Sequence, residues 1–291
     1  MTAAPDGLLV VDKPSGWTSH DVVGRVRTLA GTRKVGHAGT LDPMATGVLV
    51  LGIGRATRLL GHLALTDKDY DATIRLGVTT VTDDAEGEVV EVRDASGVGD
   101  VAPAMAALTG AIEQVPSAVS AVKVDGVRAY ARVRAGEDVE LAARTVTVSR
   151  FELLERRGDE LDVRVVCTSG TYVRALARDL GRLLGVGAHL TALRRTRVGP
   201  FALDRARTLE QLALLPGPEL AVVPLDVAVA ASFPRRELTD DEAVALSYGK
   251  KLEPTGTAGV HGAFAPDGSC IALVEDRDGV ARSTVVFAPA G

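Results

Sequence analysis

Aromatic residues are scarce in this chain of 291 residues, where Phe, Tyr and Trp together make up 3%. The core must therefore be built mainly from Ala, Val and Leu. Cysteine is scarcer still: Cys167 and Cys270 lie far apart in the sequence and in no CxxC spacing. This pattern excludes a disulfide framework and a structural zinc site, and it indicates two small buried side chains in a reducing compartment.

Long hydrophobic runs are also lacking, since none approaches the roughly 20 residues that span a bilayer. Residues 1–7 do not have the basic and apolar blocks of a signal peptide. The five histidines show no HxxxH or HExxH spacing, and residues 52–57 depart from the dinucleotide fingerprint at Thr57. We therefore expect a cytoplasmic protein with no membrane segment, no metal site and no nucleotide cofactor.

Neither sign of charge dominates, because 38 acidic and 33 basic residues leave a net charge of −5 at pH 7. That balance argues against a protein that coats nucleic acid by bulk attraction. The charge is nevertheless divided along the chain: residues 1–60 and 161–210 carry net charges of +3 and +5. The segments between and after them are acidic. If the two basic segments meet in the fold, they form a basic stripe on an acidic body.

The chain contains a mixture of hairpin and helix signals. Apolar runs and alternating patterns predict strands at 8–11, 48–51, 70–76, 145–149 and 161–167. Helical spacing and stop signals predict helices from Ser19 to Gly31, around 104–108, and over 171–184 before Gly185. Because hairpins are mixed with helices and no βαβ unit repeats, we expect an α+β fold with a mixed, mostly antiparallel central sheet flanked by helices.

A second, smaller unit begins near Ser232. Thr239 and Glu242 form a capping box for a short helix, and turn signals such as residues 266–268 separate strand-like runs. These signals predict a small β-rich domain after the larger one. The predicted boundaries are 1–231 and 232–291.

Asp42 lies in a glycine-punctuated loop at 33–47, where a carboxylate can serve as a nucleophile, a base or a metal ligand. Because Pro43 follows it, the same pair is also typical of a helix N-cap and first helical position. The spacing alone leaves both interpretations open. Tyr70 is equally open, as a core residue or as a ring that stacks on a flat substrate. Four basic residues are expected to keep Asp42 ionised: Arg33, Lys34, Arg55 and Arg58.

Arg174 and Arg178 are four residues apart on the predicted helix 171–184, so they share one of its faces. Such a pair is either part of a solvated surface or a set of phosphate contacts. Basic residues continue beyond this helix at Arg194, Arg195 and Arg197. The continuing basic density makes phosphate contact as reasonable as the solvated surface.

Taken together, these segments resemble one family. The stretch GHAGTLDPMATG at 36–47 resembles the catalytic motif of the TruB family of pseudouridine synthases, the bacterial tRNA pseudouridine-55 synthases, in its actinobacterial form. Further matches occur in the family's order at 9–19, 68–70, 75–77, 114–123, 169–174 and 193–195. The resemblance covers residues 8 to about 205, and it favours a functional Asp42 over a helix cap.

The resemblance implies the pseudouridine synthase fold with a small PUA-like C-terminal domain. It implies an isomerase that flips one uridine out of the T-loop of tRNA and converts it to pseudouridine with no cofactor and no metal. Asp42 would be the nucleophile, attacking either the ribose C1′ or the base C6. Arg174 would pair with Asp42, and Tyr70 would stack on the uracil where the C5 proton must leave.

The same resemblance implies further contacts with the RNA. Tyr172 and Leu193 would line the base pocket, and His37 would fill the space that the flipped base vacates. Lys13 would hold the active-site strands or contact a phosphate. An insert that closes on the RNA would span about 119–143. Contacts to the RNA backbone would come from Lys123, Arg128, Arg178, Arg194 and Arg195.

The implied partner is tRNA, bound at its T-arm or elbow by a monomer that needs no other protein and no membrane. One alternative is an RNA-binding protein that assists tRNA folding, a role compatible with the enzyme. Another is a paralogue that modifies ribosomal RNA with guide RNA and protein partners. Because such paralogues carry long basic tails and this sequence ends in an acidic domain, the sequence favours the stand-alone enzyme.

Overall fold

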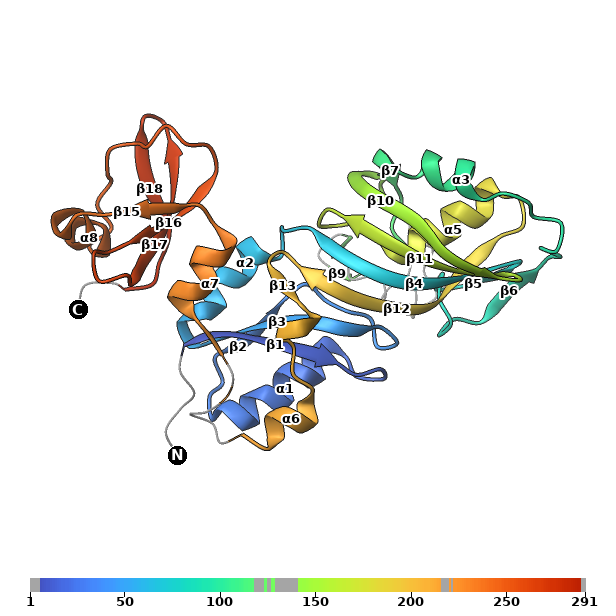
Figure 1. The fold of residues 1–291 in the computed structure, drawn as a ribbon, viewed down its shortest axis with the longest axis horizontal. Helices are drawn as coiled ribbons and strands as arrows, with labels where there is room; N and C mark the ends of the chain where they lie inside the picture. Colours follow the sequence, from blue (N-terminus) through green and yellow to red (C-terminus); the bar gives the residue numbers. More distant parts are fainter. Residues whose placement is uncertain are drawn as a thin grey trace.

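The computed structural model describes residues 6–117, 141–215, 220 and 222–288, and the backbone of 123–124 and 127–128. Within them the largest sheet has ten strands in the order β14-β1-β3-β12-β4-β11-β10-β7, with β13 beside β12 and β2 beside β3 (Figure 1). Its neighbouring strands are antiparallel except for β12 and β3. The expected α+β class with a mixed, mostly antiparallel sheet is therefore confirmed.

The strands of this sheet are β1 (Gly7–Lys13), β2 (Val35–Ala38), β3 (Thr46–Ile53), β4 (Lys68–Leu76), β7 (Gly110–Gln114), β10 (Arg144–Arg157), β11 (Glu160–Cys167), β12 (Ala188–Val198), β13 (Phe201–Ala202) and β14 (Val223–Pro224). The helices are α1 (Ser19–Ala30), η1 (Gly54–Leu59), α2 (Leu60–Leu63), α3 (Ala102–Ala107), α5 (Val173–Leu183), η2 (Leu203–Arg205), α6 (Leu209–Ala213), α7 (Leu225–Ser232) and α8 (Asp240–Ser247). Two short hairpins pair β5 (Val78–Thr80) with β6 (Val89–Val92), and β8 (Lys123–Val124) with β9 (Val127–Arg128).

Helix α1 covers β1 and β3, and its start differs from the prediction by one residue. Thr18, not Ser19, is the N-cap: its hydroxyl accepts from the Asp21 N–H, and the Asp21 carboxylate accepts from the Thr18 N–H. Both residues can cap a helix, so the sequence could not decide between them. Gly31 ends the helix as predicted, at a φ of 63°. Ser19 is consequently available for another contact.

Strand β4 alternates as predicted, so neighbouring residues lie on opposite faces of the sheet. Tyr70, Ala72, Ile74 and Leu76 are buried, while the residues between them are more exposed. The buried face packs against α5 and α3 in one apolar cluster, and Figure 1 shows both helices on the same side of this half of the sheet. The opposite face of β4 therefore carries Asp71, Thr73 and their polar neighbours.

The predicted loop at 33–47 is not entirely a loop. Val35–Ala38 forms β2, which pairs with β3 from Val35 opposite Ile53. A stretch of four residues that includes Gly36 is too short for its sequence pattern to predict a strand. Pairing with β3 holds these residues in an extended conformation. The remaining residues between β2 and β3 form the loop that carries Asp42.

The C-terminal part has its own four-stranded sheet, as the sequence predicted. Its strands are β15 (Arg235–Glu237), β16 (Val260–Phe264), β17 (Cys270–Arg277) and β18 (Val280–Val286). Phe264 and Phe287 pack in one apolar cluster with Val229 of α7 and Leu8 of β1. This sheet is thus anchored on the larger one, and the boundary at 231 and 232, where α7 ends, stays a prediction.

Further predictions concern the two cysteines, a membrane segment and the insert. Cys167 and Cys270 are buried and free as expected, and burial raises the pKa of their thiols to about 11 and about 12. Among the described residues, no helix combines the length and apolarity needed to cross a membrane. Strands β8 and β9, which lie within the predicted insert, pair with each other. The rest of the insert up to residue 140 lies outside the described residues.

Candidate active site

A cavity of about 270 Å³ lies between the loop before β3, the start of β4 and the N-terminus of α5. Residues from β12 complete its wall. It is lined by six of the residues predicted for the site: Asp42, Tyr70, Tyr172, Arg174, Leu193 and Arg195. These residues come from four separate stretches of chain, so only the fold brings them to one place. Their roles stay predictions.

The loop that carries Asp42 is fastened from two sides. Ser19 Oγ accepts a hydrogen bond from the Leu41 N–H at 2.9 Å and donates one to the Leu41 carbonyl at 3.1 Å. The Pro43 carbonyl accepts from the Gly16 N–H at 2.9 Å. The chain then continues into β3 and not into a helix, so the interpretation of Asp42 as a helix N-cap is wrong.

Arg174 is the cation paired with Asp42. Its Nε lies 3.0 Å from Asp42 Oδ2, and its Nη2 donates to Asp42 Oδ1 at 3.3 Å. Its Nη1 lies 3.3 Å from Asp84 Oδ2 and donates to the Thr82 carbonyl at 3.0 Å. The Arg174 side chain is 7% exposed and the Asp42 side chain 35%. A planar guanidinium held by a second carboxylate and a carbonyl presents its remaining N–H groups to Asp42 in a fixed direction.

Burial opposes the ionisation of Asp42, and nearby basic side chains offset part of that effect. Burial raises the pKa of the Asp42 carboxyl above its ordinary value; Arg174 and Lys13 lower it, and the Asp84 carboxylate raises it again. The net direction is upward. Asp42 is therefore a more basic carboxylate than an exposed aspartate, and Arg174 is the main group that favours its ionised form.

The prediction of basic residues beside Asp42 is wrong for Arg55 and Arg58. Arg55 pairs with Asp6, and Arg58 donates to the Val286 carbonyl of the C-terminal sheet. The cation that contacts Asp42 comes instead from α5, 132 positions later in the chain. Sequence neighbours of a loop residue can point anywhere, whereas the pairing partner is decided by the fold.

Tyr70 lies at the bottom of the same cavity and is 7% exposed. Burial raises the pKa of its phenol above the ordinary value, so the hydroxyl is protonated at neutral pH. The ring offers a flat apolar surface to a base, and the protonated hydroxyl can pass a proton only by giving up its own. Tyr70 is thus a buried residue that also lines the cavity. Its stacking on a flat substrate stays a prediction.

Two buried cations stand beside Tyr70. Lys68 Nζ donates to the Ala64 and Thr66 carbonyls at 2.9 and 2.7 Å, and burial lowers its pKa to about 8. Arg195 is 1% exposed, and its guanidinium donates to the Val48 and Gly39 carbonyls at 2.7 and 3.1 Å. Both side chains line the cavity and tie its walls together.

Lys13 is fully buried and does not face the cavity. Its Nζ donates to the Trp17, Pro14 and Pro43 carbonyls at 2.6, 2.9 and 3.1 Å. Of the two predicted roles, holding the active-site strands fits this geometry. The phosphate contact, and with it the assignment of Lys13 as a substrate-binding residue, is wrong because the ammonium has no exposed surface to offer.

His37 lies on β2 and does not line the cavity. Burial lowers the pKa of its imidazole, and its Nδ1 has no hydrogen-bond partner in the described part of the chain. Its predicted place beside the flipped nucleotide stays a prediction.

The residues predicted to contact the RNA backbone differ in their burial and in the groups that they contact. Arg195 is buried against carbonyls, so that prediction is wrong for it. Arg178 pairs with Asp83 at 3.2 Å and Asp179 at 3.1 Å, and Arg194 pairs with Asp12 at 2.7 Å. The basic segments do meet, because β12 pairs with β3, but acids already neutralise much of the expected stripe. The side chains of Lys123 and Arg128 lie outside the described residues.

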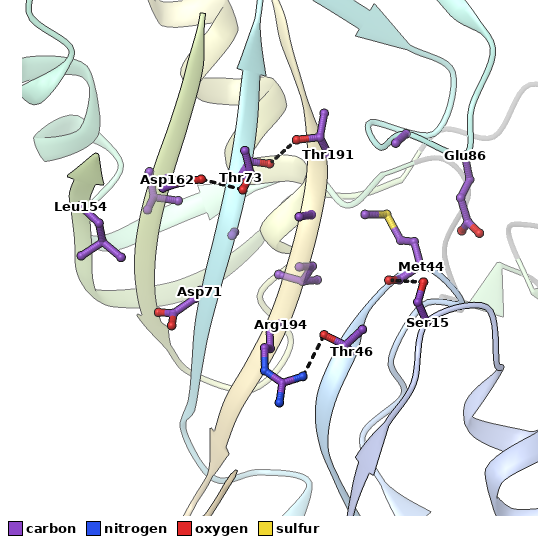
Figure 2. Close-up of a pocket in the computed structure, with 15 residues that line it drawn as sticks. Ser15, Met44, Thr46, Asp71, Thr73, Glu86, Leu154, Asp162, Thr191 and Arg194 are labelled. Carbon is purple, nitrogen blue, oxygen red and sulfur yellow. Dashed lines mark hydrogen bonds between the residues drawn. The ribbon is translucent and has the colours of Figure 1, made fainter. Parts of the chain in front are cut away.

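A larger cavity, of about 650 Å³, lies on the other face of β4 and β12. Figure 2 shows Asp71, Thr73 and Asp162 on β4 and β11, with Thr191 and Arg194 on β12. Thr73 donates to Asp162 at 2.7 Å, and Thr191 donates to the Thr73 carbonyl at 3.2 Å. These polar groups satisfy one another along an open sheet face. Leu193 lines both cavities, yet only the smaller one contains the Asp42–Arg174 pair.

Sequence reasoning missed Asp84 and Lys68, which stand beside the predicted residues. Asp84 lies in a run of acids that resembles any solvated surface, and Lys68 was noted only within a family match. The available signal was that Asp84 is one of two consecutive aspartates in a turn between two strands. No group of three or more His, Cys, Asp or Glu side chains able to hold a metal occurs among the described residues.

Comparison with known families gives three matches along the chain. Residues 27–173 match the model of the TruB family pseudouridylate synthase N-terminal domain. Residues 174–216 match the tRNA pseudouridylate synthase B C-terminal domain, and residues 233–288 match the tRNA pseudouridine synthase II C-terminal domain. The β-rich C-terminal unit predicted from the sequence is thus a known part of this family.

Individual relatives agree with the family models. A protein of Rhodococcus jostii (strain RHA1) named tRNA pseudouridine synthase B is 62% identical, over 98% of this chain and 94% of that protein. One of Arthrobacter sp. (strain FB24) with the same name is 61% identical, over 97% of each. A chain in the crystal structure of a Cbf5-Nop10-Gar1 complex is 28% identical with a TM-score of 0.74, over 97% of this chain and 85% of the other. The chain belongs to the TruB family of pseudouridylate synthases.

Proposed function

We propose that this protein is a tRNA pseudouridine-55 synthase, an isomerase that converts one uridine of the T-loop of tRNA to pseudouridine. The observation that supports this most strongly is the Asp42–Arg174 pair, 3.0 Å apart, at the wall of a cavity that also holds Tyr70 and Leu193. A base drawn into this cavity would lie between an aromatic ring and an aliphatic side chain. Reaching it requires that the base leave its stack in the RNA.

The chemistry needs one nucleophile that is later released. In one route a carboxylate oxygen of Asp42 bonds to the ribose C1′, and the N1–C1′ bond breaks with its electron pair moving to the base. The base turns, C5 bonds to C1′ and Asp42 is released. C5 loses its proton and N1 gains one, so no electrons are gained or lost overall. Attack at C6 instead of C1′ returns the same product and the same free carboxylate.

The residues predicted for the site have separate roles in this scheme. Arg174 keeps Asp42 ionised and directed at the cavity despite the burial that opposes its charge. Tyr70 stacks on the uracil and relays the C5 proton. Tyr172 and Leu193 complete the walls around the base. Lys13, Ser19 and Arg195 hold the surrounding backbone and do not touch the RNA.

The partner follows from the family. With relatives named tRNA pseudouridine synthase B matching nearly the whole chain, we take tRNA, at its T-arm, as the substrate of a cytoplasmic monomer. A structural neighbour is described as an H/ACA RNP bound to a substrate RNA, at 25% identity and a TM-score of 0.72 over 97% of this chain and 85% of the other. The higher identity to the tRNA enzymes favours a protein that works without guide RNA.

The test is to incubate the purified full chain with a tRNA transcript and, separately, with a ribosomal RNA transcript, and to map pseudouridine in both. We expect one modified uridine in the T-loop of the tRNA and none in the ribosomal RNA. Modification of the ribosomal RNA alone, or of no RNA, would contradict the proposal. If an Asp42→Asn variant without activity restores growth to a deletion strain, assistance with tRNA folding contributes as well.

A further inference from the structure

A set of buried polar contacts joins the end of β7 to Tyr172, at the start of helix α5. The Gln114 side-chain amide is 1% exposed; its Oε1 accepts from the Tyr172 N–H at 2.8 Å, and its Nε2 donates to the Tyr172 carbonyl at 3.1 Å. Tyr172 is the N-cap position of α5, and no side chain caps this helix. Gln114 therefore fixes the main chain two residues before Arg174.

The next residues of the same segment are held by Arg178, which lies further along α5. Arg178 Nη2 donates to the Val115 carbonyl at 2.7 Å, and its Nη1 donates to Asp83 Oδ2 at 3.2 Å. Ser117, fully buried, donates to the same Asp83 oxygen at 2.6 Å. One guanidinium thus joins the segment after β7 to the turn that carries Asp83.

The two consecutive aspartates of that turn serve two arginines of one helix. Asp84 meets Arg174, and Asp83 meets Arg178. Arg174 and Arg178 are four positions apart, so they lie one above the other on the same face of α5. Asp83 has a φ of 60°, a conformation that asparagine and aspartate tolerate better than other side chains. The backbone at this turn is bent so that neighbouring carboxylates point to successive turns of the helix.

We propose that Gln114, Ser117, Asp83 and Arg178 form a positioning clamp that sets where Arg174 and Asp84 stand relative to Asp42. The clamp touches none of the reacting atoms. It acts by holding the first turn of α5 and the turn at Asp83 in register, so that a loosened clamp shifts the guanidinium that directs Asp42. The inference rests on the proposed function, and it replaces the phosphate contact predicted for Arg178 with a role inside the protein.

A phosphate contact and the clamp predict different effects of replacing Arg178 with lysine. A lysine keeps the charge that a phosphate contact needs, but its single ammonium cannot reproduce the planar fork that reaches both Val115 and Asp83. The clamp therefore predicts that Arg178→Lys lowers the single-turnover rate constant on the order of 10-fold, because small misplacements of catalytic groups reduce rates strongly. It predicts unchanged tRNA affinity and an unchanged salt dependence of binding.

The experiment compares Arg178→Lys, Asp83→Asn, Ser117→Ala and the double variant Asp83→Asn with Arg178→Lys in the full chain. The matched control is Arg150→Ala, whose side chain is 57% exposed and 3.7 Å from its nearest acid. Under the clamp, the single variants lose rate to similar extents, the double variant loses little more than either, and the control keeps the wild-type rate. Asparagine preserves the size and the backbone tolerance at position 83, so Asp83→Asn fits the turn. Circular dichroism spectra confirm the fold of each variant before its rate is compared.

Losses that multiply in the double variant, or a fall in affinity and in the salt slope with the rate unchanged, would overturn the clamp. A second readout does not depend on activity: in Gln114→Met the amide of Tyr172 should exchange its hydrogen faster, while amides later in α5 keep their protection. Unchanged exchange at Tyr172 would also overturn it. If the wild type itself forms no pseudouridine, the proposed function fails, whereas the exchange result still decides whether the clamp holds.

Discussion

The two cavities lie on opposite faces of the same strands, and neighbouring residues serve one or the other. On β4, Tyr70 faces the smaller cavity and Asp71 the larger; on β12, Arg195 lines the smaller and Arg194 the larger. Their charged residues differ: the smaller cavity has one acid, Asp42, with Lys68, Arg174 and Arg195, whereas the larger has three acids and the single arginine Arg194. The two cavities also differ in how exposed their paired charged side chains are.

On the larger cavity's face, polar groups form a ladder across the strands at the surface. Arg164 pairs with Asp71 at 2.8 Å with both side chains about 40% exposed, and such pairs contribute little free energy because water competes for both groups. On the smaller cavity's face, Arg174 is 7% exposed between Asp42 and Asp84. A buried carboxylate paired with a buried arginine is typical of functional sites, so we propose the smaller cavity, despite its smaller volume, as the site of reaction.

Among replacements of the basic residues, the largest effect is expected at Arg174, the arginine that pairs with Asp42 in the smaller cavity. Arg174→Lys keeps a positive charge but cannot contact Asp42, Asp84 and the Thr82 carbonyl together. We expect the single-turnover rate constant to fall on the order of 100-fold, with tRNA affinity nearly unchanged. The measurement is pseudouridine formation in a tRNA transcript with enzyme in excess. Arg164→Lys, on the face of the larger cavity, is the control and should keep the wild-type rate. Equal losses of rate in both variants would contradict the assignment of the reaction to the smaller cavity.

Replacing Arg195 and Arg194 in turn tests the comparison with neighbouring residues of one type. Arg195→Ala leaves the Val48 and Gly39 carbonyls without their buried donor, which should lower the free energy of unfolding by about 3 kcal/mol. Arg194→Ala removes a half-exposed pair with Asp12 and should cost about 1 kcal/mol or less. Urea unfolding of both variants gives the two values.

Affinity supplies the second half of that test. If Arg194 contacts a phosphate, its removal flattens the plot of log affinity for tRNA against log salt by about 1. Arg195→Ala, measured where the variant is folded, should leave this slope unchanged. A reversed pattern would mean that the buried arginine turns outward to meet RNA.

The different fates of Arg194 and Arg195 also show where sequence reasoning stops. A strand alternates faces strictly only while its pairing is regular, and β12 shifts register against β4 between Leu190 and Ala192 and again between Arg195 and Arg197. Counting residues along β12 therefore cannot say which arginine is buried. The regular strand β4, by contrast, could be predicted from alternation alone.

A smaller effect is expected for the pH dependence of the reaction. Ionised Asp42 is required, and its pKa in the folded protein is raised, so the rate should fall as pH decreases through a value above the ordinary carboxyl pKa of about 4. Asp84 is one cause of the rise. In Asp84→Asn the acid limb of the rate profile should move to lower pH, even though the plateau rate falls. A shift to higher pH would contradict the assigned electrostatics.

How much of the site the sequence could predict depended on the kind of contact. The family motifs predicted Asp42, Tyr70 and Arg174, and the fold gathers them at one cavity. Asp84 and the clamp at Gln114 were not predicted, because such partners come from distant turns and are chosen by tertiary packing. A buried residue such as Lys13 shows the opposite error, since a cation in a motif looks the same whether it holds carbonyls or contacts a phosphate.

The measurement that tests the central claim most directly is single-turnover conversion of a tRNA T-arm by Asp42→Asn and Asp162→Asn side by side. Both variants exchange a carboxylate for an amide of the same shape, one in each cavity. With the smaller cavity as the reactive site, Asp42→Asn forms no pseudouridine while still binding the RNA, and Asp162→Asn keeps a rate within about twofold of wild type, as its exposed partners allow. Turnover by Asp42→Asn, or its loss in Asp162→Asn alone, would contradict the account.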